Sequence, residues 1–249
     1  MKALLLAAGY GTRLDPITKV IPKCMVPIKG RPLLDIWIES LLEGGITQVL
    51  INTHYKNEIV EEFISNSSWK DLVVLVHEDK LLGTGSTILK NETFFCEDTF
   101  LVAHADNLTD LIISNLIDSH AKVDQDILAT MLLFNTPKPE ACGVVKLKGG
   151  LVTEFFEKKL TDNGNLANGA VYIFNRTVFN ILRDIKKESI DISLDLIPLI
   201  LGKINSHIHE GYFQDIGDIN NWVEANLYFK EQKMKKQNVE AWKLALKGE

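Results

Sequence analysis

Short apolar runs alternate with amphipathic segments through roughly the first half of the chain. Four runs have the length and apolar character of buried strands and end at glycine or at polar residues: Ala3–Ala7, Gln48–Asn52, Leu72–His77 and Phe100–Ala105. Helical spacing of apolar residues follows over Leu33–Leu42, which stops at Gly44-Gly45, over Ile59–Ile64, and over a short segment after the glycine-containing turn beyond His77. Strands and helices that alternate at this spacing predict βαβ units and a parallel sheet.

The pattern changes after about residue 125, where strand-like segments follow one another with little helix between the middle ones. These segments are Ile127–Phe134, Gly143–Leu147, Leu151–Phe156 and Ala170–Phe174. They predict an antiparallel or mixed half that closes over one side of the first sheet. Helices are expected over Val178–Ile185 and Leu194–Leu201, a strand over His207–Phe213, and a C-terminal helix that begins near Asp218.

The length of 249 residues allows one large α/β domain, or a core domain with a small appendage. We expect a main domain of residues 1–225, in two halves, 1–125 and 126–225, and a helical tail over 226–249. The chain has no internal repeat and no low-complexity linker. The Lys-rich stretch Lys230–Lys247 has helical spacing and is interpreted as a solvated helix or a packing arm.

Composition narrows the class of protein. Hydrophobic residues make up 46% and charged residues 24%, which is ordinary for a soluble globular protein, and no apolar run approaches the roughly 20 residues that span a bilayer. The N-terminus MKALLLAAGYG is predicted to be a buried strand and not a signal peptide. Cys24, Cys96 and Cys142 lack metal-ligand spacing and indicate a reducing compartment. We therefore expect a cytoplasmic protein with no membrane partner.

Charge is distributed unevenly. The net charge of −6 argues against non-specific binding of nucleic acid. Residues 1–31 nevertheless carry six basic residues against Asp15 alone, a local net charge of +5; the six are Lys2, Arg13, Lys19, Lys23, Lys29 and Arg31. A cationic segment on an acidic protein suits a small polyanion, although a chance cluster of solvated charges is the alternative.

The loop that follows the first strand has the chemistry of a phosphate site. Residues 7–28 read AAGYGTRLDPITKVIPKCMVPI, and Gly9 and Gly11 let backbone N–H groups approach phosphate oxygens. Arg13 offers a planar fork and Lys23 a movable point charge, while three prolines stiffen the loop. Two common phosphate loops are excluded, because no G-x-x-x-x-G-K-[ST] string occurs and Leu14 stands where a dinucleotide fingerprint needs its third glycine.

The longer string GxGTRLxPxT…PKxMxPI resembles the sugar-1-phosphate nucleotidyltransferases, which include mannose-1-phosphate guanylyltransferases and glucose-1-phosphate thymidylyl- and uridylyltransferases. The resemblance extends to about residue 225. It implies an α/β, Rossmann-like, mixed but mainly parallel sheet flanked by helices, of the nucleotide-diphospho-sugar transferase type, with a small sugar-binding β portion. The half 1–125 would bind the nucleotide and the half 126–225 the sugar. The chain also resembles the stand-alone, short members of the family. This resemblance is compatible with a homo-oligomer.

The resemblance implies roles for individual residues on the nucleotide side. Lys23 would contact phosphates near the reacting centre, and the positions that would hold the nucleoside triphosphate are Ala8, Gly9, Gly11, Thr12 and Arg13. The segment His77–Gly85 resembles the family's strand-then-LGTA/G segment, in which Glu78, Gly83 and Thr84 would bracket base and ribose. Without the resemblance, that segment would be interpreted as a strand end and a helix start.

Two aspartates are candidate Mg²⁺ ligands. Asp106 and Asp215 each follow or end a predicted strand, and carboxylates beside phosphates are typical of magnesium sites. A single such carboxylate is often a helix cap. His104 is a weaker candidate for a catalytic base, since a histidine at a strand end is more often structural. The chain has AD at 105–106 where the family usually has GD, and DIGDINNW where it has DIGTPEDY.

The sugar side is expected from four further positions. The resemblance implies that Gly143 lets the backbone reach the sugar, that Glu157 accepts hydrogen bonds from sugar hydroxyls, that Lys158 holds the sugar phosphate, and that Asn168 reaches a hydroxyl. The chain departs from the family at Lys159, which replaces a proline, and at Gly169-Ala170, which exchanges the order of NAG. An exposed ion pair and an Asn-Gly turn are the plainer interpretations.

The expected reaction is an in-line displacement in which the sugar phosphate attacks the α-phosphorus of a triphosphate and pyrophosphate leaves, with Arg13, Lys23 and Asp106 catalytic. No side-chain nucleophile is needed, and no GxSxG string occurs. The strings NLANGAVYIF and LLGTG resemble the mannose- and heptose-type guanylyltransferase branch of the family, which implies GTP and a mannose- or heptose-type sugar. The alternatives are a UTP- or dTTP-dependent glucose-1-phosphate enzyme, a phosphocholine-type cytidylyltransferase and a non-catalytic nucleotide-sugar regulator. Leu14 makes a Rossmann oxidoreductase the least favoured.

Overall fold

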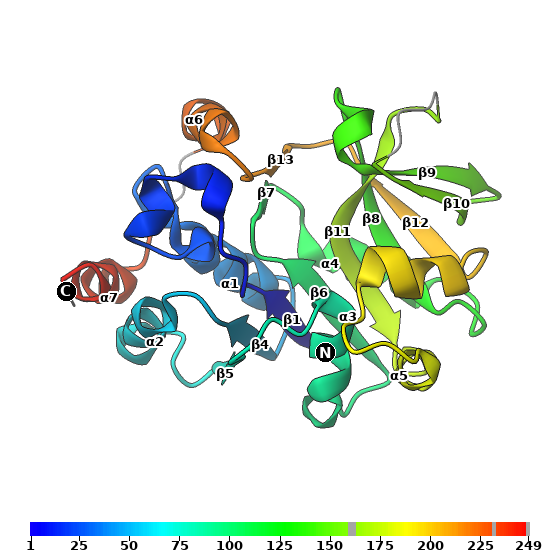
Figure 1. Ribbon diagram of the computed structural model, residues 1–249, viewed down its shortest axis with the longest axis horizontal. Coiled ribbons are helices and arrows are strands. Elements are labelled where there is room, and N and C mark those ends of the chain that lie inside the picture. The colour runs from blue at the N-terminus through cyan, green and yellow to red at the C-terminus, as the bar shows by residue number, and fades with distance from the viewer. Residues whose placement is uncertain (159–162, 231–232, 248–249) are drawn as a thin grey trace. The chain divides into compact units, whose positions relative to one another are not determined.

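A computed structural model describes residues 1–158, 163–230 and 233–247 of the chain (Figure 1). It divides into two compact units, each discontinuous in sequence. The first, here called the loop unit, comprises Ala3–Leu81, His104–Asp110 and Tyr212–Glu249. The second, here called the sheet unit, comprises Met1–Lys2, Leu82–Ala103 and Leu111–Gly211. The proposed halves 1–125 and 126–225 concern which ligand is bound, and they stay a prediction.

The loop unit contains three neighbouring strands in the order β5 (Val73–His77), β4 (Gln48–Thr53) and β1 (Lys2–Leu6). β4 and β5 pair in parallel, in a register that places Thr53 opposite His77. The apolar side chains of β1 and β4 are almost all buried, as expected for strands covered on both faces, whereas in the edge strand β5 only Val73 is buried. Helices α1 (Leu33–Glu43) and α2 (Asn57–Asn66) follow β1 and β4 in the chain, which confirms the predicted strand–helix alternation.

The predicted glycine- and proline-rich loop between β1 and α1 is built from short regular pieces. It contains three single 3₁₀ turns and a minimal hairpin: η1 (Thr12–Leu14), η2 (Ile17–Lys19), η3 (Lys23–Met25), β2 (Pro27–Ile28) and β3 (Arg31–Pro32). Leu14, Cys24 and Met25 point inward and are buried. The loop is therefore held in shape by its own apolar side chains, which lowers the entropy that ligand binding would have to remove.

A small antiparallel pair, β7 (Asn107–Thr109) with β13 (Phe213–Asp215), was not predicted. The predicted strand His207–Phe213 is wrong in its bounds, because β12 (Ile204–His209) ends before Gly211 and β13 begins only at Phe213. Asp218 begins helix α6 (Ile219–Tyr228) as predicted, since its Oδ1 accepts the backbone N–H of Asn221 at 3.0 Å.

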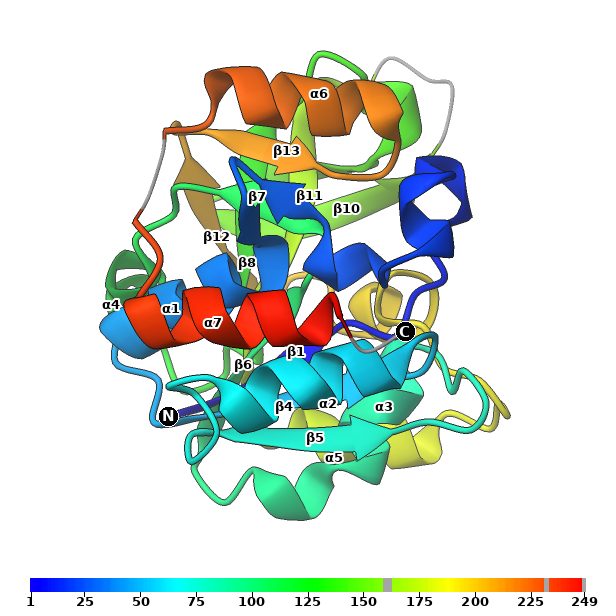
Figure 2. The same cartoon turned by 90° about the vertical axis from the view of Figure 1, so that its left-hand side faces the viewer.

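The Lys-rich tail is a packing arm, as one of the two interpretations predicted. Helix α7 (Lys236–Ala245) lies along α2 (Figure 2). Asn238, Ala241, Trp242 and Ala245 form its buried face, whereas most of its charged side chains are exposed. Trp242 packs edge-on against Phe63 of α2, with ring centroids 6.4 Å apart. This amphipathic division explains why helical spacing could be recognised in a segment so rich in lysine.

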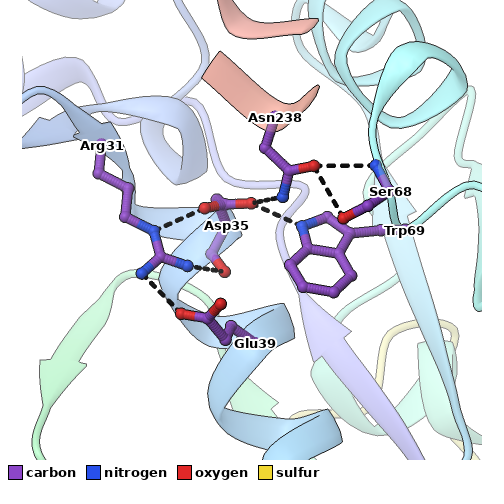
Figure 3. A network of polar contacts seen from close by, with 6 residues as sticks. All are labelled: Arg31, Asp35, Glu39, Ser68, Trp69 and Asn238. Carbon is purple, nitrogen blue, oxygen red and sulfur yellow. Dashed lines mark hydrogen bonds and ion pairs between the residues drawn. The ribbon is translucent and has the colours of Figure 1, made fainter. Parts of the chain in front are cut away.

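A buried polar network anchors α7 to α1 (Figure 3). The carboxylate of Asp35 is fully buried and accepts hydrogen bonds from Arg31 Nε at 2.6 Å, Trp69 Nε1 at 2.6 Å and Asn238 Nδ2 at 2.7 Å. Asn238 Oδ1 accepts in turn from the backbone N–H and the hydroxyl of Ser68, at 2.8 and 2.9 Å. A buried carboxylate is stable only when its oxygens are satisfied in this way.

The sheet unit is built on strands in the order β6 (Thr99–His104, to Ala103 in this unit), β11 (Leu166–Asn175), β8 (Ala129–Asn135), β12, β10 (Leu151–Glu157) and β9 (Gly143–Lys148). β8 and β12 pair in parallel and the other neighbours pair antiparallel, which confirms the predicted mixed half. Helix α3 (Thr84–Lys90) contacts α5 (Val178–Asp184). Helix α4 (Ile113–Ala121), which was not predicted, packs on β8, β11 and β12.

The predicted helix Leu194–Leu201 is replaced by a π-helical turn, Ile192–Leu196, followed by a 3₁₀ turn, Ile197–Leu199. Pro198 has no backbone N–H, so an α-helix could not continue through it undisturbed. Asp191 caps the turn, and its carboxylate accepts the N–H groups of Ser193 and Leu194. Among all helices of the described residues, none has both the length and the apolar character needed to cross a membrane.

We expect Asn238→Ala to lower the free energy of unfolding by about 2–4 kcal/mol, because it removes the acceptor of Ser68 N–H and one of the two donors to Asp35 Oδ1 among the described residues, which leaves only Trp69 Nε1. Urea unfolding of both proteins measures the difference. Gln237→Ala, on the neighbouring exposed position, is the control and should change stability by less than about 0.5 kcal/mol. Equal effects of the two substitutions would contradict an anchoring role for the network.

Candidate active site

Gly11 is required by the local fold of the loop. Its φ of +67° lies in the left-handed region, and an added Cβ would come within 2.8 Å of Lys23 Cβ. The Gly11 carbonyl also accepts the hydroxyl of Thr18 at 2.9 Å. Gly9 differs, since an added Cβ there would meet none of the described atoms within 4 Å. Intramolecular packing therefore explains the glycine at 11 but not the glycine at 9, and a contact of Gly9 with a triphosphate stays a prediction.

Lys23 brings two aspartates together. Its buried side chain places Nζ 2.5 Å from Asp106 Oδ2 and 3.8 Å from Asp215 Oδ1. Backbone hydrogen bonds hold both carboxylates, because Ala105 N–H donates to Leu6 at the end of β1 and Ile216 N–H donates to Asp106. The two aspartates, more than 100 residues apart in sequence, therefore meet at one lysine within the loop unit.

Arg13 reaches the same place. An added Cβ at Gly217 would lie 3.1 Å from a terminal nitrogen of the Arg13 guanidinium and would collide with Asp215 Oδ2. The absence of a side chain at Gly217 thus makes room for Arg13 beside Asp215. The structure brings together four of the charged residues that the sequence singled out in this unit: Arg13, Lys23, Asp106 and Asp215.

The charges shift the titration of the site. Burial alone would raise the pKa of Asp106, but the positive charge of Lys23, with His104 and hydrogen bonds to the carboxylate, lowers it below its usual value. Burial, and then the charge of Asp106, raise the pKa of Asp215, and Lys23 and Arg13 offset this only in part. Burial also raises the pKa of Cys24 to about 12, so that thiol is not an available nucleophile.

Two carboxylates that share one lysine fit a magnesium site. Mg²⁺ is held in proteins by one or two carboxylates together with substrate phosphates. Asp106 and Asp215 would supply that oxygen set. Burial, and then the charge of Asp106, raise the pKa of Asp215, and a divalent cation would relieve the repulsion between the two carboxylates. Within the described residues there is no cluster of three or more His, Cys, Asp or Glu suited to a metal. Phosphate oxygens would therefore have to complete the coordination.

His104 contributes to this electrostatic environment without an evident catalytic contact. Its Nε2 is buried and has no hydrogen-bond partner among the described residues. Its proximity favours the ionised form of Asp106, as the lowered pKa of that carboxyl shows. A role as catalytic base stays a prediction.

Sequence reasoning missed the residues that hold Glu78 near the loop. Glu78 is buried, and its Oε1 accepts Nδ2 of Asn52 at 2.9 Å. The Glu78 carbonyl lies 2.6 Å from His54 Nδ1, and His54 Nε2 lies 2.8 Å from the hydroxyl of Tyr10 in the phosphate loop. A polar Asn52 directly after the apolar run Val49–Ile51, near the end of β4, was the signal that could have identified this connection.

In the sheet unit, the LLGTG segment is already occupied by protein contacts. The Thr84 hydroxyl accepts the N–H of Ile192 at 2.8 Å and lies 3.1 Å from Asp191 Oδ2. Gly83 has a φ of +92°, and an added Cβ would come within 2.7 Å of the Ile190 carbonyl. The glycine and the hydroxyl therefore have structural roles here, and contacts of Gly83 and Thr84 with a nucleotide stay predictions.

Gly143 and Glu157 form one contact. An added Cβ at Gly143 would lie 2.7 Å from Glu157 Oε2 and 2.5 Å from Phe155 Cζ, so the glycine makes room for these two side chains. Lys158 Nζ lies 3.6 Å from Glu157 Oε1, and its φ of +47° turns the chain at the strand end. Lys159 lies outside the described residues.

Asn168 is held by its own strand. Its Nδ2 donates to the hydroxyl of Tyr172 at 2.6 Å and its Oδ1 accepts the N–H of Ala170 at 2.9 Å. Burial raises the pKa of Tyr172, as do the nearby charges of Asp191 and Glu157, so Tyr172 stays a neutral hub beside Asn168 and Glu157. Ala170 has a φ of +51°, a conformation that favours glycine, at the position where the NAG order would place one.

Comparisons with known proteins decide the family. A profile described as Nucleotidyl transferase matches residues 2–232. The chain belongs to this family. The nucleotidyltransferase is 30% identical over 217 residues to a D-glycero-alpha-D-manno-heptose 1-phosphate guanylyltransferase of Aneurinibacillus thermoaerophilus, covering 87% of this chain and 93% of that one. It is 28% identical over 249 residues to a mannose-1-phosphate guanyltransferase of Yarrowia lipolytica, covering 97% of this chain and 67% of that one.

The fold of this nucleotidyltransferase is equally clear from solved structures. A UDP-glucose pyrophosphorylase complexed with UDP-glucose superposes with a TM-score of 0.77 at 27% identity, over 93% of this chain and 99% of that one. The expected nucleotide-diphospho-sugar transferase fold and membership of the sugar-1-phosphate nucleotidyltransferases are both confirmed. The chain spans only 62% to 67% of the length of several mannose-type relatives.

We expect Gly9→Ala and Gly11→Ala to separate binding from folding. Gly9→Ala should leave stability within about 0.5 kcal/mol of the parent but weaken triphosphate binding about tenfold, because the methyl group enters the space where phosphate oxygens approach the backbone. Gly11→Ala should cost at least about 2 kcal/mol through left-handed strain and the clash with Lys23. Calorimetry and nucleotide titration measure both. A stable Gly11→Ala protein, or unchanged binding by Gly9→Ala, would contradict these roles.

We expect Ala170→Gly to stabilise the protein by about 0.5–1 kcal/mol, because glycine adopts φ of +51° without the Cβ strain. The melting temperature should rise by about 1–4 °C. Ala121→Gly, at the end of α4, is the matched control and should lower stability by up to about 1 kcal/mol. A loss of stability in both variants would show that Ala170 is not strained.

Proposed function

We propose that the protein transfers a nucleoside monophosphate from GTP to a mannose- or heptose-type sugar 1-phosphate and releases pyrophosphate. The observation that carries the proposal is the meeting of Lys23 with Asp106 and Asp215 beside Arg13 and the open Gly9. A site of this kind combines fixed positive charge for phosphates with oxygen ligands for a divalent cation. It contains no activated nucleophile among its described residues, which agrees with a direct displacement between two substrates.

In the proposed step, an oxygen of the sugar phosphate forms a bond to the α-phosphorus of the triphosphate as the bond from that phosphorus to the bridging oxygen of pyrophosphate breaks. Arg13 and the loop amides, including those of Ala8, Gly9, Gly11 and Thr12, would hold the phosphates of the triphosphate. Lys23 would neutralise the charge that grows at the α-phosphate. Positioning and charge neutralisation by preorganised groups supply most of the catalysis in such transfers.

Asp106 and Asp215 would hold Mg²⁺, which when bound supplies charge neutralisation for the phosphate oxygens. Lys23 keeps Asp106 ionised, since its charge lowers the pKa of that carboxyl. The ionised Asp106 is thus ready to act as an oxygen ligand at neutral pH. Lys23 would thus have two roles: it would be the counter-ion of the two carboxylates, and it would donate hydrogen bonds to the phosphate.

In this proposal the sugar-side residues bind the sugar 1-phosphate, which accepts the nucleoside monophosphate. Lys158 is exposed at the end of β10 and would bind the sugar phosphate, while the partly exposed Glu157 would accept hydrogen bonds from hydroxyls. Gly143 supports Glu157 by leaving space for its carboxylate. Asn168, which lies beside Tyr172, would donate to or accept from a sugar hydroxyl. Gly83, Thr84 and Glu78 would contact the base and ribose of the nucleotide.

The choice of GTP and of a manno-configured sugar is supported by the names of the two relatives at 28% and 30% identity, both of which are guanyltransferases. The similarity to a UDP-glucose pyrophosphorylase keeps a uridylyl- or thymidylyltransferase as the alternative. The retained Gly143, Glu157 and Lys158 argue against a phosphocholine acceptor, and the intact charged site argues against a non-catalytic regulator.

Pyrophosphate release by the purified protein with Mg²⁺ tests the proposal. GTP, UTP, dTTP, CTP and ATP are each combined with mannose, glucose, N-acetylglucosamine and heptose 1-phosphates. Release that requires both GTP and a mannose or heptose 1-phosphate supports the proposed function. Release with UTP or dTTP and glucose 1-phosphate replaces the proposed substrates, and tight binding of a nucleotide-sugar without release with any pair favours the regulator.

We expect Lys23→Met and Asp106→Asn each to lower kcat by about 10²–10³ while the protein stays folded. Lys23→Met removes the positive charge proposed to act at the α-phosphate, and Asp106→Asn removes an anionic ligand proposed for Mg²⁺. Arg13→Lys should also be impaired, since a lysine lacks the planar fork. Steady-state kinetics with saturating substrates and circular dichroism check this. Lys19→Met, an exposed cation of the same loop, is the control and should turn over like the parent. Parent-like turnover by either Lys23→Met or Asp106→Asn would exclude the assigned site.

A further inference from the structure

A chain of hydrogen bonds connects the start of the phosphate loop to the buried carboxylate of Glu78. Asn52, only 3% exposed at the end of β4, accepts the N–H of Ala7 with its Oδ1 at 2.8 Å. The same amide donates through Nδ2 to Glu78 Oε1 at 2.9 Å. One side chain therefore contacts both the first residue of the loop and a residue assigned above to the base and ribose side.

The chemistry of the two partners fixes the orientation of this amide. A backbone N–H can only donate, so the Asn52 oxygen must face Ala7. An ionised carboxylate can only accept, so the Asn52 nitrogen must face Glu78. An aspartate in place of Asn52 would keep the acceptor for Ala7 but would put a second carboxylate against Glu78, with burial making their repulsion costly.

A second branch returns from Glu78 to the loop. The Glu78 carbonyl can only accept, so the 2.6 Å contact with His54 requires the proton on Nδ1. With the proton on Nδ1, an unprotonated Nε2 can accept the hydroxyl of Tyr10, which lies 2.8 Å away. The loop is thus attached to residue 78 at both Ala7 and Tyr10, on either side of Ala8 and Gly9.

We propose that Asn52 is a positioning residue for nucleotide binding, which sets the conformation of loop residues 7–10 and couples it to Glu78. This inference rests on the proposed function, because it assigns Ala8, Gly9 and Glu78 to one nucleotide. Asn52 itself is too buried to touch substrate. It acts by fixing where the loop amides stand relative to the Glu78 carboxylate, so its loss raises KM for the triphosphate and leaves KM for the sugar phosphate unchanged.

A double-mutant cycle tests the coupling. Asn52→Asp in the parent protein should lower kcat/KM for the triphosphate about 10²-fold, as expected when reacting groups are displaced by about 1 Å. In a Glu78→Gln background the same substitution should cost less than about fivefold, because the amide introduced by Glu78→Gln can donate to the carboxylate introduced by Asn52→Asp. An equal cost in both backgrounds, or an equal rise of KM for the sugar phosphate, would overturn the proposal.

Hydrogen exchange of the Ala7 amide gives a readout that needs no substrate. Asn52→Ser, which buries no new charge but cannot span both partners, should speed exchange of Ala7 at least about tenfold with global stability still measurable by urea unfolding. Unchanged protection of Ala7 would overturn the proposal. If the parent releases no pyrophosphate with any pair, the proposed function fails, and this exchange measurement still decides whether Asn52 positions the loop.

Asn66→Asp is the matched control for the cycle. Asn66 is exposed at the end of α2 and donates its Nδ2 to Glu62 Oε1 at 2.9 Å, the same amide-to-carboxylate contact without a link to the loop. It should leave kcat/KM within about twofold of the parent, as expected of a surface substitution. A loss equal to that of Asn52→Asp would assign both effects to general destabilisation and would overturn the positioning role.

Discussion

The candidate site of the loop unit depends on the burial of one cation, Lys23, between two aspartates. A lysine so little exposed to water requires negative partners, and Asp106 at 2.5 Å and Asp215 at 3.8 Å provide them. The backbone keeps those partners in place through the β7–β13 pair and the bond from Ile216 to Asp106. Three distant segments of the chain are thereby held at one point.

The same constraint explains the form of the loop. Lys23 packs directly over Gly11, whose left-handed φ and missing Cβ allow the approach. The next inward residues, Cys24 and Met25, are core residues, so the lysine is carried on a rigid turn. The pKa of about 12 for Cys24 follows from that burial and identifies the thiol as a packing group. The rigid neighbours of Lys23 thus fix the position of its ammonium group, although the side chain is flexible and its charge has little directional preference.

Much of this was predictable from the sequence, and the exceptions have physical causes. Apolar strands and the phosphate string identified β1, β4, β5 and the four charged residues, because burial and charge leave local patterns. β7 and β13 are three residues each, too short for any period to show, and their pairing is long-range. The capped π-turn at 192–196 depends on Asp191, and the role of Asn52 depends on partners at 7 and 78. Such partners are defined only by the fold.

Thr84 and Asn168, two residues singled out from the sequence motifs, have structural hydrogen bonds of their own. Thr84 ties α3 to the Asp191 turn, and Asn168 satisfies Tyr172 and Ala170 within its own strand. A side chain with its hydrogen bonds already made can bind a hydroxyl only by using a remaining lone pair or by exchanging a partner. In both cases a rigid surrounding favours binding, because a donor or acceptor that is already fixed loses little entropy when the ligand binds. Asn168, whose hydrogen bonds are made within its own strand, is therefore held in one orientation, as its proposed contact with a sugar hydroxyl would require.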